Sequence, residues 1–188
     1  MTIPADLPVF AFSAERLIAR GPASDAMPAI HAAASDAGPL LVFDAATGRV
    51  IDLDLRGTAQ DAAARLAPPA VQPEPERRGP GRPKLGVAAR EVTLLPRHWD
   101  WLSSRPGGAS VALRKLVEAE MKAAEGPDRA RKAQEAAYRF MTTMAGDRPG
   151  YEEATRRLFA GDGDGLQAAM QEWPQGVREI ALDLAQTR

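Results

Sequence analysis

The chain has 188 residues with 24 basic and 25 acidic side chains, so its formal net charge is −1, and it contains no cysteine. This length accommodates one large domain or two to three small ones. The lack of cysteine excludes a disulfide framework, a zinc finger and a thiol nucleophile. The first residues lack the pattern of a signal peptide, and no apolar run reaches the length of a membrane helix. We therefore expect a cytoplasmic protein with no membrane partner.

The charges are distributed unevenly along the chain. Residues 1–70 carry 5 basic and 8 acidic side chains, residues 71–132 carry 13 and 8, and residues 133–188 carry 6 and 9. A basic band between two acidic ends is compatible with a partner that bears phosphates. The alternative interpretation is a solvated linker with ordinary helix charges.

Residues 1–67 are expected to form a small N-terminal α+β domain with the element order ββαββα. Ser24 is placed to cap a helix that extends to about residue 37. Thr58 and Asp61 have the spacing of a capping box and predict a second helix that ends at residue 66. Apolar patterning predicts four strands, at residues 9–12, 16–19, 40–43 and 50–55.

The sequence offers no residues that indicate an enzyme. Asp44, Asp52 and Asp54 form an acidic cluster, but no histidine is near them and no recognised metal-ligand spacing is met. A solvated strand face is the better interpretation. His31 lies among alanines on a predicted helix, where a structural role is expected. We therefore expect no catalytic residue, no metal and no cofactor, and we expect that the protein is not an enzyme.

Residues 68–89 form a proline-rich basic linker, or arm, between two domains. Within it, Gly81-Arg82-Pro83-Lys84 resembles the core of an AT-hook. In such a motif the glycine and proline keep the backbone narrow while the arginine enters an A·T minor groove. Pro80 stands where AT-hooks usually have a basic residue. The resemblance implies DNA contacts by four basic residues, Arg77, Arg78, Arg82 and Lys84; the alternative is a plain charged linker.

Residues 90–126 are expected to form a strand, a short helix, a glycine turn and a longer helix. Residues 91–95 have strand propensity, and Pro96 suits the first turn of the short helix. Ser110 is placed to cap the longer helix, and Gly126-Pro127 is expected to end it. Four residues form its apolar stripe at helical spacing: Leu113, Leu116, Val117 and Met121.

This order of elements resembles the ribbon-helix-helix family. The resemblance implies that two chains pair their strands into a ribbon that enters the major groove, and that the second helix points its N-terminus at a phosphate. Arg90 and Thr93 are then candidates for base contacts, and Ser110 for a phosphate contact. The module would be a homodimer, with an expected core of Val92, Leu94, Trp99, Leu102, Leu113, Leu116, Val117 and Met121.

The strand departs from the family pattern. In the family's register, the residues of this strand that would face DNA are Leu94, Val92 and Arg90. Of these three, only Arg90 has a side chain that suits a contact with DNA. A shift of one residue would expose Glu91 and Thr93 instead, and Glu91 would be repelled by phosphate although it could accept a hydrogen bond from cytosine. The alternative is that this module serves only dimerisation and the arm makes the DNA contact.

Residues 127–188 are expected to form a C-terminal helical bundle. The predicted helices cover residues 128–144, 151–160, 166–173 and a last one that starts at Pro174. Asp164 is expected to cap the third helix. Phe140, Met141 and Met144 are interpreted as core residues, with an effector pocket as the alternative.

Most of the chain is similar to a bacterial family of uncharacterised proteins. The similarity rests on residues 81–86, 91–99 and 107–110 and on the later Ala137-Tyr138-Arg139-Phe140-Met141. It implies no activity. The first functional hypothesis is a homodimeric DNA-binding protein that acts as a transcriptional regulator. The second is a non-enzymatic interaction or scaffolding module that dimerises through residues 90–125 and binds a protein partner through its terminal domains.

Overall fold

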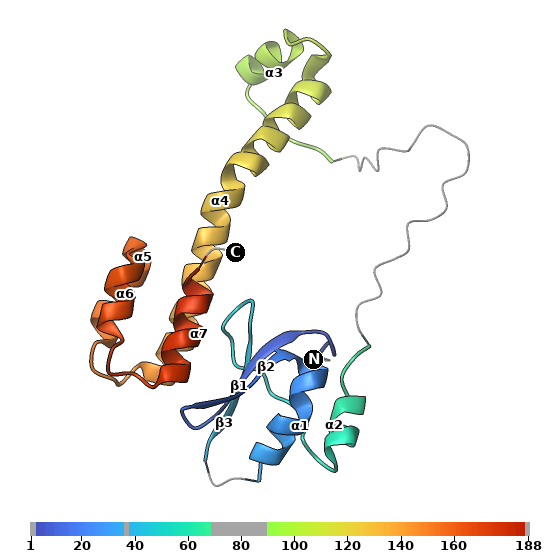
Figure 1. Cartoon of the computed structure of the whole chain (residues 1–188). Coiled ribbons are helices and arrows are strands. Elements are labelled where there is room, and N and C mark those ends of the chain that lie inside the picture. Colours follow the sequence, from blue (N-terminus) through green and yellow to red (C-terminus); the bar gives the residue numbers. More distant parts are fainter. Residues whose placement is uncertain (1–2, 36–37, 69–89, 187–188) are drawn as a thin grey trace. The chain divides into compact units, whose positions relative to one another are not determined.

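The protein is described by a computed structural model that covers residues 3–35, 38–68 and 90–186 (Figure 1). These residues form one three-stranded sheet and seven helices, which confirms the expected α+β class. The chain divides into two compact units, which we call the first unit (Met1–Val71 and Asp128–Arg188) and the central unit (Gln72–Pro127). No helix in the described ranges combines the length and the apolar composition needed to cross a lipid bilayer.

The sheet has the order β2-β1-β3, with antiparallel pairing throughout. The predicted strands at residues 9–12, 16–19 and 40–43 are confirmed as β1 (Pro8–Ser13), β2 (Arg16–Pro22) and β3 (Leu40–Asp44). A tight turn with Ala14 at φ 50° joins β1 to β2.

The predicted fourth strand at residues 50–55 is not formed. Only an isolated bridge between Phe43 and Val50 continues the sheet, and the Ile51 N–H donates to the carbonyl of Val42 at 2.8 Å. The residues Ile51 and Asp52 interrupt the alternation of apolar and polar side chains that would keep one strand face against the core. The unit therefore has three strands rather than the expected four.

The central strand β1 is buried on both faces. Val9 and Ala11 belong to one apolar cluster together with Ile30 of α1 (Ala23–Ala33). Phe10 and Phe12 belong to the other cluster, which contains residues of the C-terminal helices. Because successive side chains of a strand point to opposite faces, a continuous apolar run lets β1 contribute to two cores at once.

The two N-terminal helices differ in how well their starts were predicted. The helix α2 (Ala59–Ala64) begins at Thr58, and the Thr58 side chain and the Asp61 carboxylate each accept a hydrogen bond from the other residue's backbone N–H. This confirms the predicted capping box. Ser24 does not cap α1, because the position before the helix is held by Pro22, which has no side-chain cap.

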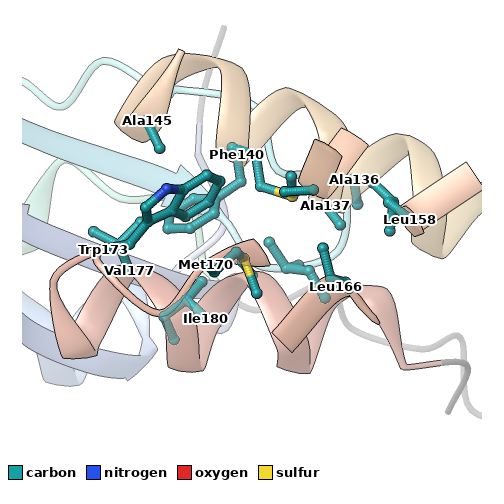
Figure 2. Packing of buried hydrophobic residues seen from close by; sticks show 14 of the residues in the cluster. Ala136, Ala137, Phe140, Ala145, Leu158, Leu166, Met170, Trp173, Val177 and Ile180 are labelled. Atoms are coloured by element: carbon teal, nitrogen blue, oxygen red, sulfur yellow. The ribbon is translucent and has the colours of Figure 1, made fainter. Parts of the chain in front are cut away.

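One apolar core contains residues from both ends of the chain. The Phe140 ring lies 5.6 Å from the Phe12 ring and 5.0 Å from the Phe43 ring, measured between centroids. Figure 2 shows the side chains of α4 (Gly108–Ala145) directed toward those of α5 (Tyr151–Ala160), α6 (Gly163–Ala169) and α7 (Gln175–Ala185). Phe140 and Met141 are fully buried here, which confirms them as core residues.

Of the predicted helix boundaries in the C-terminal half that are wrong, two concern the end of a helix at Gly126-Pro127 and the cap of α6. Gly126-Pro127 does not end a helix, because α4 runs without interruption from Gly108 to Ala145 with Pro127 inside it. Proline removes one helical hydrogen bond, but Gly126 lacks the Cβ that would clash with the proline ring, and strong helix formers flank the pair. The helix α6 is capped by Asp162, whose carboxylate accepts from the Gly165 N–H, and not by Asp164.

Candidate interaction surface

Residues 90–95 precede the first helix of the central unit as an extended segment that belongs to no sheet. The strand predicted at residues 91–95 is therefore not formed in the described chain, and that prediction is wrong. The backbone groups of residues 90–94 make no hydrogen bond with another described backbone group. The side chains of Val92 and Leu95 are 56% and 50% exposed. A segment with open backbone groups and apolar side chains is prone to pair with another chain.

The short helix α3 (Pro96–Ser103) presents two tryptophans to solvent. It begins at Pro96 as predicted, because a proline at the first helical position loses no hydrogen bond. Trp99 and Trp101 are both exposed, and the guanidinium of Arg105 stacks over the Trp101 ring at 4.1 Å from the centroid. Leu102, which was expected in a dimer core, is already buried within the single chain.

The turn between α3 and α4 places Ser110 differently from the prediction. Gly107 and Gly108 both have the positive φ values that glycine tolerates, so the chain turns there and α4 begins at Gly108. Ser110 therefore lies inside the first turn of α4, and the prediction that it caps the helix is wrong. Its hydroxyl accepts a hydrogen bond from Nη2 of Arg114 at 3.0 Å.

The first half of α4 carries an apolar face with little cover. Leu116, Val117 and Met121 are large apolar residues that are 47%, 54% and 67% exposed, and Leu113 is half-buried. At about 100° per residue, these four positions fall within an arc of roughly 140° on the helix. The predicted stripe therefore exists as one face of the helix.

The central unit thus leaves many large apolar side chains in contact with solvent. We call them the exposed apolar set: Val92, Leu95, Trp99, Trp101, Leu116, Val117 and Met121. Five of the eight residues predicted for a dimer core belong to it. Of the other three, Leu94 and Leu113 are half-buried and Leu102 is buried. Exposed apolar surface of this kind marks interaction sites in proteins.

The residues predicted to bind nucleic acid fall into two groups. The four basic residues of the arm, Arg77, Arg78, Arg82 and Lys84, lie outside the described residues. Arg90 and Thr93 are exposed on the extended segment. Residues 90–127 carry six basic and five acidic side chains, whereas residues 77–90 carry five basic and none acidic. The excess positive charge of the middle third is therefore concentrated in the arm.

The acidic cluster of the N-terminal region has local structural contacts. The Asp44 carboxylate accepts hydrogen bonds from the N–H groups of Ala46 and Thr47. Asp54 pairs with Arg56, whose side chain holds the Asp54 pKa far below its usual range through hydrogen bonds. Nε2 of His31 donates to the carbonyl of Gly57 at 2.8 Å. In the described ranges, no group of three or more histidine, aspartate or glutamate residues is arranged to hold a metal ion.

Sequence reasoning missed a groove of the first unit, of about 580 Å³, which is lined by residues of β1, β2, α4 and α7. Its charged residues include Arg20 and Lys132, which are more than a hundred positions apart in the chain. Neither residue lies in a motif. The only local indication of this groove in the sequence is the group of basic residues Arg129, Arg131 and Lys132. These residues lie at the C-terminal end of the basic band at residues 71–132.

Comparison with known families finds a match, whereas no curated protein and no solved structure matches the chain. The family match covers residues 8–185, from the first residue of β1 to the last residue of α7. It confirms the predicted similarity to an uncharacterised bacterial family. Because the match spans nearly all of the sequence, the chain belongs to the family described as "Uncharacterized protein conserved in bacteria (DUF2239)".

Proposed function

We propose that this protein is a homodimeric DNA-binding protein with a role in transcription regulation. The exposed apolar set joins two copies, and the basic arm at residues 77–84 contacts DNA. The observation that carries the proposal is the exposure of seven large apolar side chains within residues 92–121. Leaving this much apolar surface in water is unfavourable, and covering it with a second copy removes that cost.

The extended segment supports a second copy as the occupant of this surface. Two such segments can pair antiparallel about a twofold axis between Val92 and Thr93, as in ribbon-helix-helix proteins. In that register Glu91 lies opposite Leu94, and Arg90 lies opposite Leu95. No like charges face each other, so self-pairing avoids the repulsion that cross-strand like charges cause.

The charge distribution supports the arm as the DNA contact. Residues 90–127 have a formal charge of only +1, from six basic and five acidic side chains. The arm adds four positive charges within eight residues and contains no acidic residue. A dimer carries two arms, and phosphate neutralisation by both gives a stronger and more salt-dependent interaction than one arm alone.

A second candidate function is a dimeric or heteromeric interaction module that binds no nucleic acid. The near-neutral charge of residues 90–127 favours it, because surfaces that track a phosphate backbone are usually strongly basic. The same exposed apolar set would then bind another protein. A measurement of nucleic-acid binding distinguishes the two candidate functions, because only the first requires it.

The test is fluorescence anisotropy of labelled A·T-rich and G·C-rich duplexes at about 50 mM and about 200 mM salt. We expect wild-type protein to bind with strong salt dependence and to favour the A·T-rich duplex. Arg82→Ala should weaken A·T binding roughly tenfold, since a groove-reading arginine is lost. Arg16→Ala in β2 removes the same charge elsewhere and should change little. No binding of either duplex at low salt would reject the DNA-binding function and leave the interaction module.

A further inference from the structure

The two exposed tryptophans of α3 lie on opposite flanks of the helix. At about 100° per residue, Trp101 lies roughly 160° around the helix from Trp99 and roughly 100° from the buried Leu102. Trp99 shares its flank with the apolar Leu95, which precedes it by four residues. Trp101 therefore has different neighbours from Trp99.

The neighbours of Trp101 are basic. Arg97 precedes Trp101 by one helical turn and lies about 40° from it around the axis, and His98 lies about 60° from it. Arg105 follows by four residues, and its guanidinium lies over the indole ring at 4.1 Å from the centroid. We call these four exposed residues, Arg97, His98, Trp101 and Arg105, the Trp101 flank. In the described ranges, neither Arg97 nor His98 forms an ion pair or a side-chain hydrogen bond, so both side chains are open to a ligand.

Positive charge is concentrated around this flank. Residues 92–117 contain four basic side chains and one acidic one, Asp100, which gives a formal charge of +3. Residues 118–127 contain one basic side chain and three acidic ones. The near-neutral total for the central module is therefore the sum of a basic part, which includes the Trp101 flank, and an acidic part. A basic surface of this kind attracts an anionic ligand.

The indole and the basic side chains together fit an unpaired base and its phosphates. Arg105 covers one face of the Trp101 ring, yet Trp101 is still 45% exposed, so part of the ring remains open. Bases of any identity stack on exposed aromatic rings, and arginine both adds to such stacking and binds phosphate. In a duplex the bases already stack on one another, so a base reaches the indole only where it is unpaired.

We propose that the Trp101 flank binds single-stranded nucleic acid. A base stacks on Trp101, and Arg97 and Arg105 contact the phosphates beside it. The inference rests on the proposed function for the class of partner, but it uses neither the arm nor the other six members of the exposed apolar set. The protein then has one contact for a duplex, in the arm, and a second contact for unpaired bases, in α3.

The experiment measures fluorescence anisotropy of a labelled oligonucleotide of about 15 thymidines with the full-length protein at about 50 mM salt. We expect wild-type protein to bind it and Trp101→Ala to bind it roughly tenfold more weakly, because one base loses its stacking partner. Trp101→Phe keeps an aromatic ring and should stay within about threefold of wild type. A uridine RNA of the same length should bind within about threefold of the thymidine oligonucleotide, because these contacts do not use the 2′-hydroxyl.

Two charge reversals locate the phosphate contact. Arg97→Glu should weaken binding of the thymidine oligonucleotide at least roughly tenfold, through loss of a charge-assisted hydrogen bond and added repulsion. Lys122→Glu reverses the same charge on α4, outside the Trp101 flank, and should change the affinity less than about threefold. Sedimentation velocity of Trp101→Ala should show the same oligomeric state as wild type, because the second copy does not cover this flank.

Three results would overturn the inference. The first is the absence of binding to the thymidine oligonucleotide at low salt. The second is a Trp101→Ala variant that binds it like wild type, whatever the effect of Arg97→Glu. The third is a Trp101→Ala variant that keeps its affinity but dimerises more weakly, which would place Trp101 under the second copy. Each differs from a failure of the proposed function, which depends on duplex binding and on Arg82.

Discussion

Gly48 shows how a single residue fixes the contact between the two ends of the chain. It has a φ of +65°, and a Cβ atom built on it would lie 2.0 Å from the carbonyl oxygen of Ala136 in α4. The neighbouring Thr47 carbonyl accepts a hydrogen bond from Nη1 of Arg139, also in α4. Glycine is therefore required here for two reasons, the left-handed backbone and the close approach of α4.

We expect Gly48→Ala to destabilise the first unit by about 2–4 kcal/mol, from the left-handed conformation and the clash together. Gly163→Ala is the matched control, because a Cβ atom added to Gly163 would meet open space and its φ is not positive. Urea unfolding of both variants measures the difference. Equal midpoints for the two variants would show that the turn after β3 does not pack on α4 in this way.

At the scale of elements, local signals were reliable where one segment determines the outcome. The capping box of Thr58 and Asp61 and the buried run at residues 40–43 need only neighbouring residues, and both predictions were confirmed. Gly126-Pro127 also carries a strong local signal, but it failed because the flanking residues keep the backbone helical through the proline. A local stop signal competes with helix propensity on both sides, and the sequence does not state which is stronger.

The cap of α6 gives a prediction about pH. Asp162 has a pKa lowered from its ordinary value by the hydrogen bond from the Gly165 N–H and then by Arg157. A lowered pKa in the folded state means that the ionised form stabilises the fold above the unfolded pKa, and that this stabilisation is lost as pH falls through the folded pKa. Asp162→Asn keeps the acceptor for Gly165 but removes the charge.

We therefore expect Asp162→Asn to have a lower melting temperature than wild type at pH 7, with a gap that closes as the pH falls below about 4. Asp164→Asn removes one charge from the same helix and should produce a smaller gap, because Asp164 does not contact Arg157 in the way that Asp162 does. Thermal unfolding monitored by circular dichroism, between pH 3 and pH 7 in steps of about one pH unit, measures both melting-temperature gaps. A gap that stays constant across this range would exclude the charge as its source.

At the scale of the molecule, the sequence could not show which segments meet. Phe140 was predicted as a core residue, but nothing near it in the chain indicates that Phe12 and Phe43 are its partners. The groove residues were missed for the same reason. In contrast, the stripe at residues 113–121 was predicted correctly because helical spacing alone defines a face.

The account of the whole molecule depends on what covers the exposed apolar set. In the proposed dimer, a second copy of the chain would cover the open segment at residues 90–95, the exposed Trp99 of α3 and the exposed apolar face of α4. Val117 is central to that face, since Leu116 and Met121 lie on either side of it around the helix. A charge at Val117 would be buried without a partner in a dimer and would remain solvated in a monomer.

Sedimentation velocity of wild type, Val117→Glu and Ala119→Glu tests this claim most directly. The account predicts a dimer for wild type and for Ala119→Glu, which adds the same charge at an exposed position outside the set. It predicts that Val117→Glu weakens dimerisation roughly a hundredfold and sediments as a monomer with an unchanged circular dichroism spectrum. Wild-type protein that remains monomeric at high concentration, or a Val117→Glu variant as dimeric as wild type, would contradict the account.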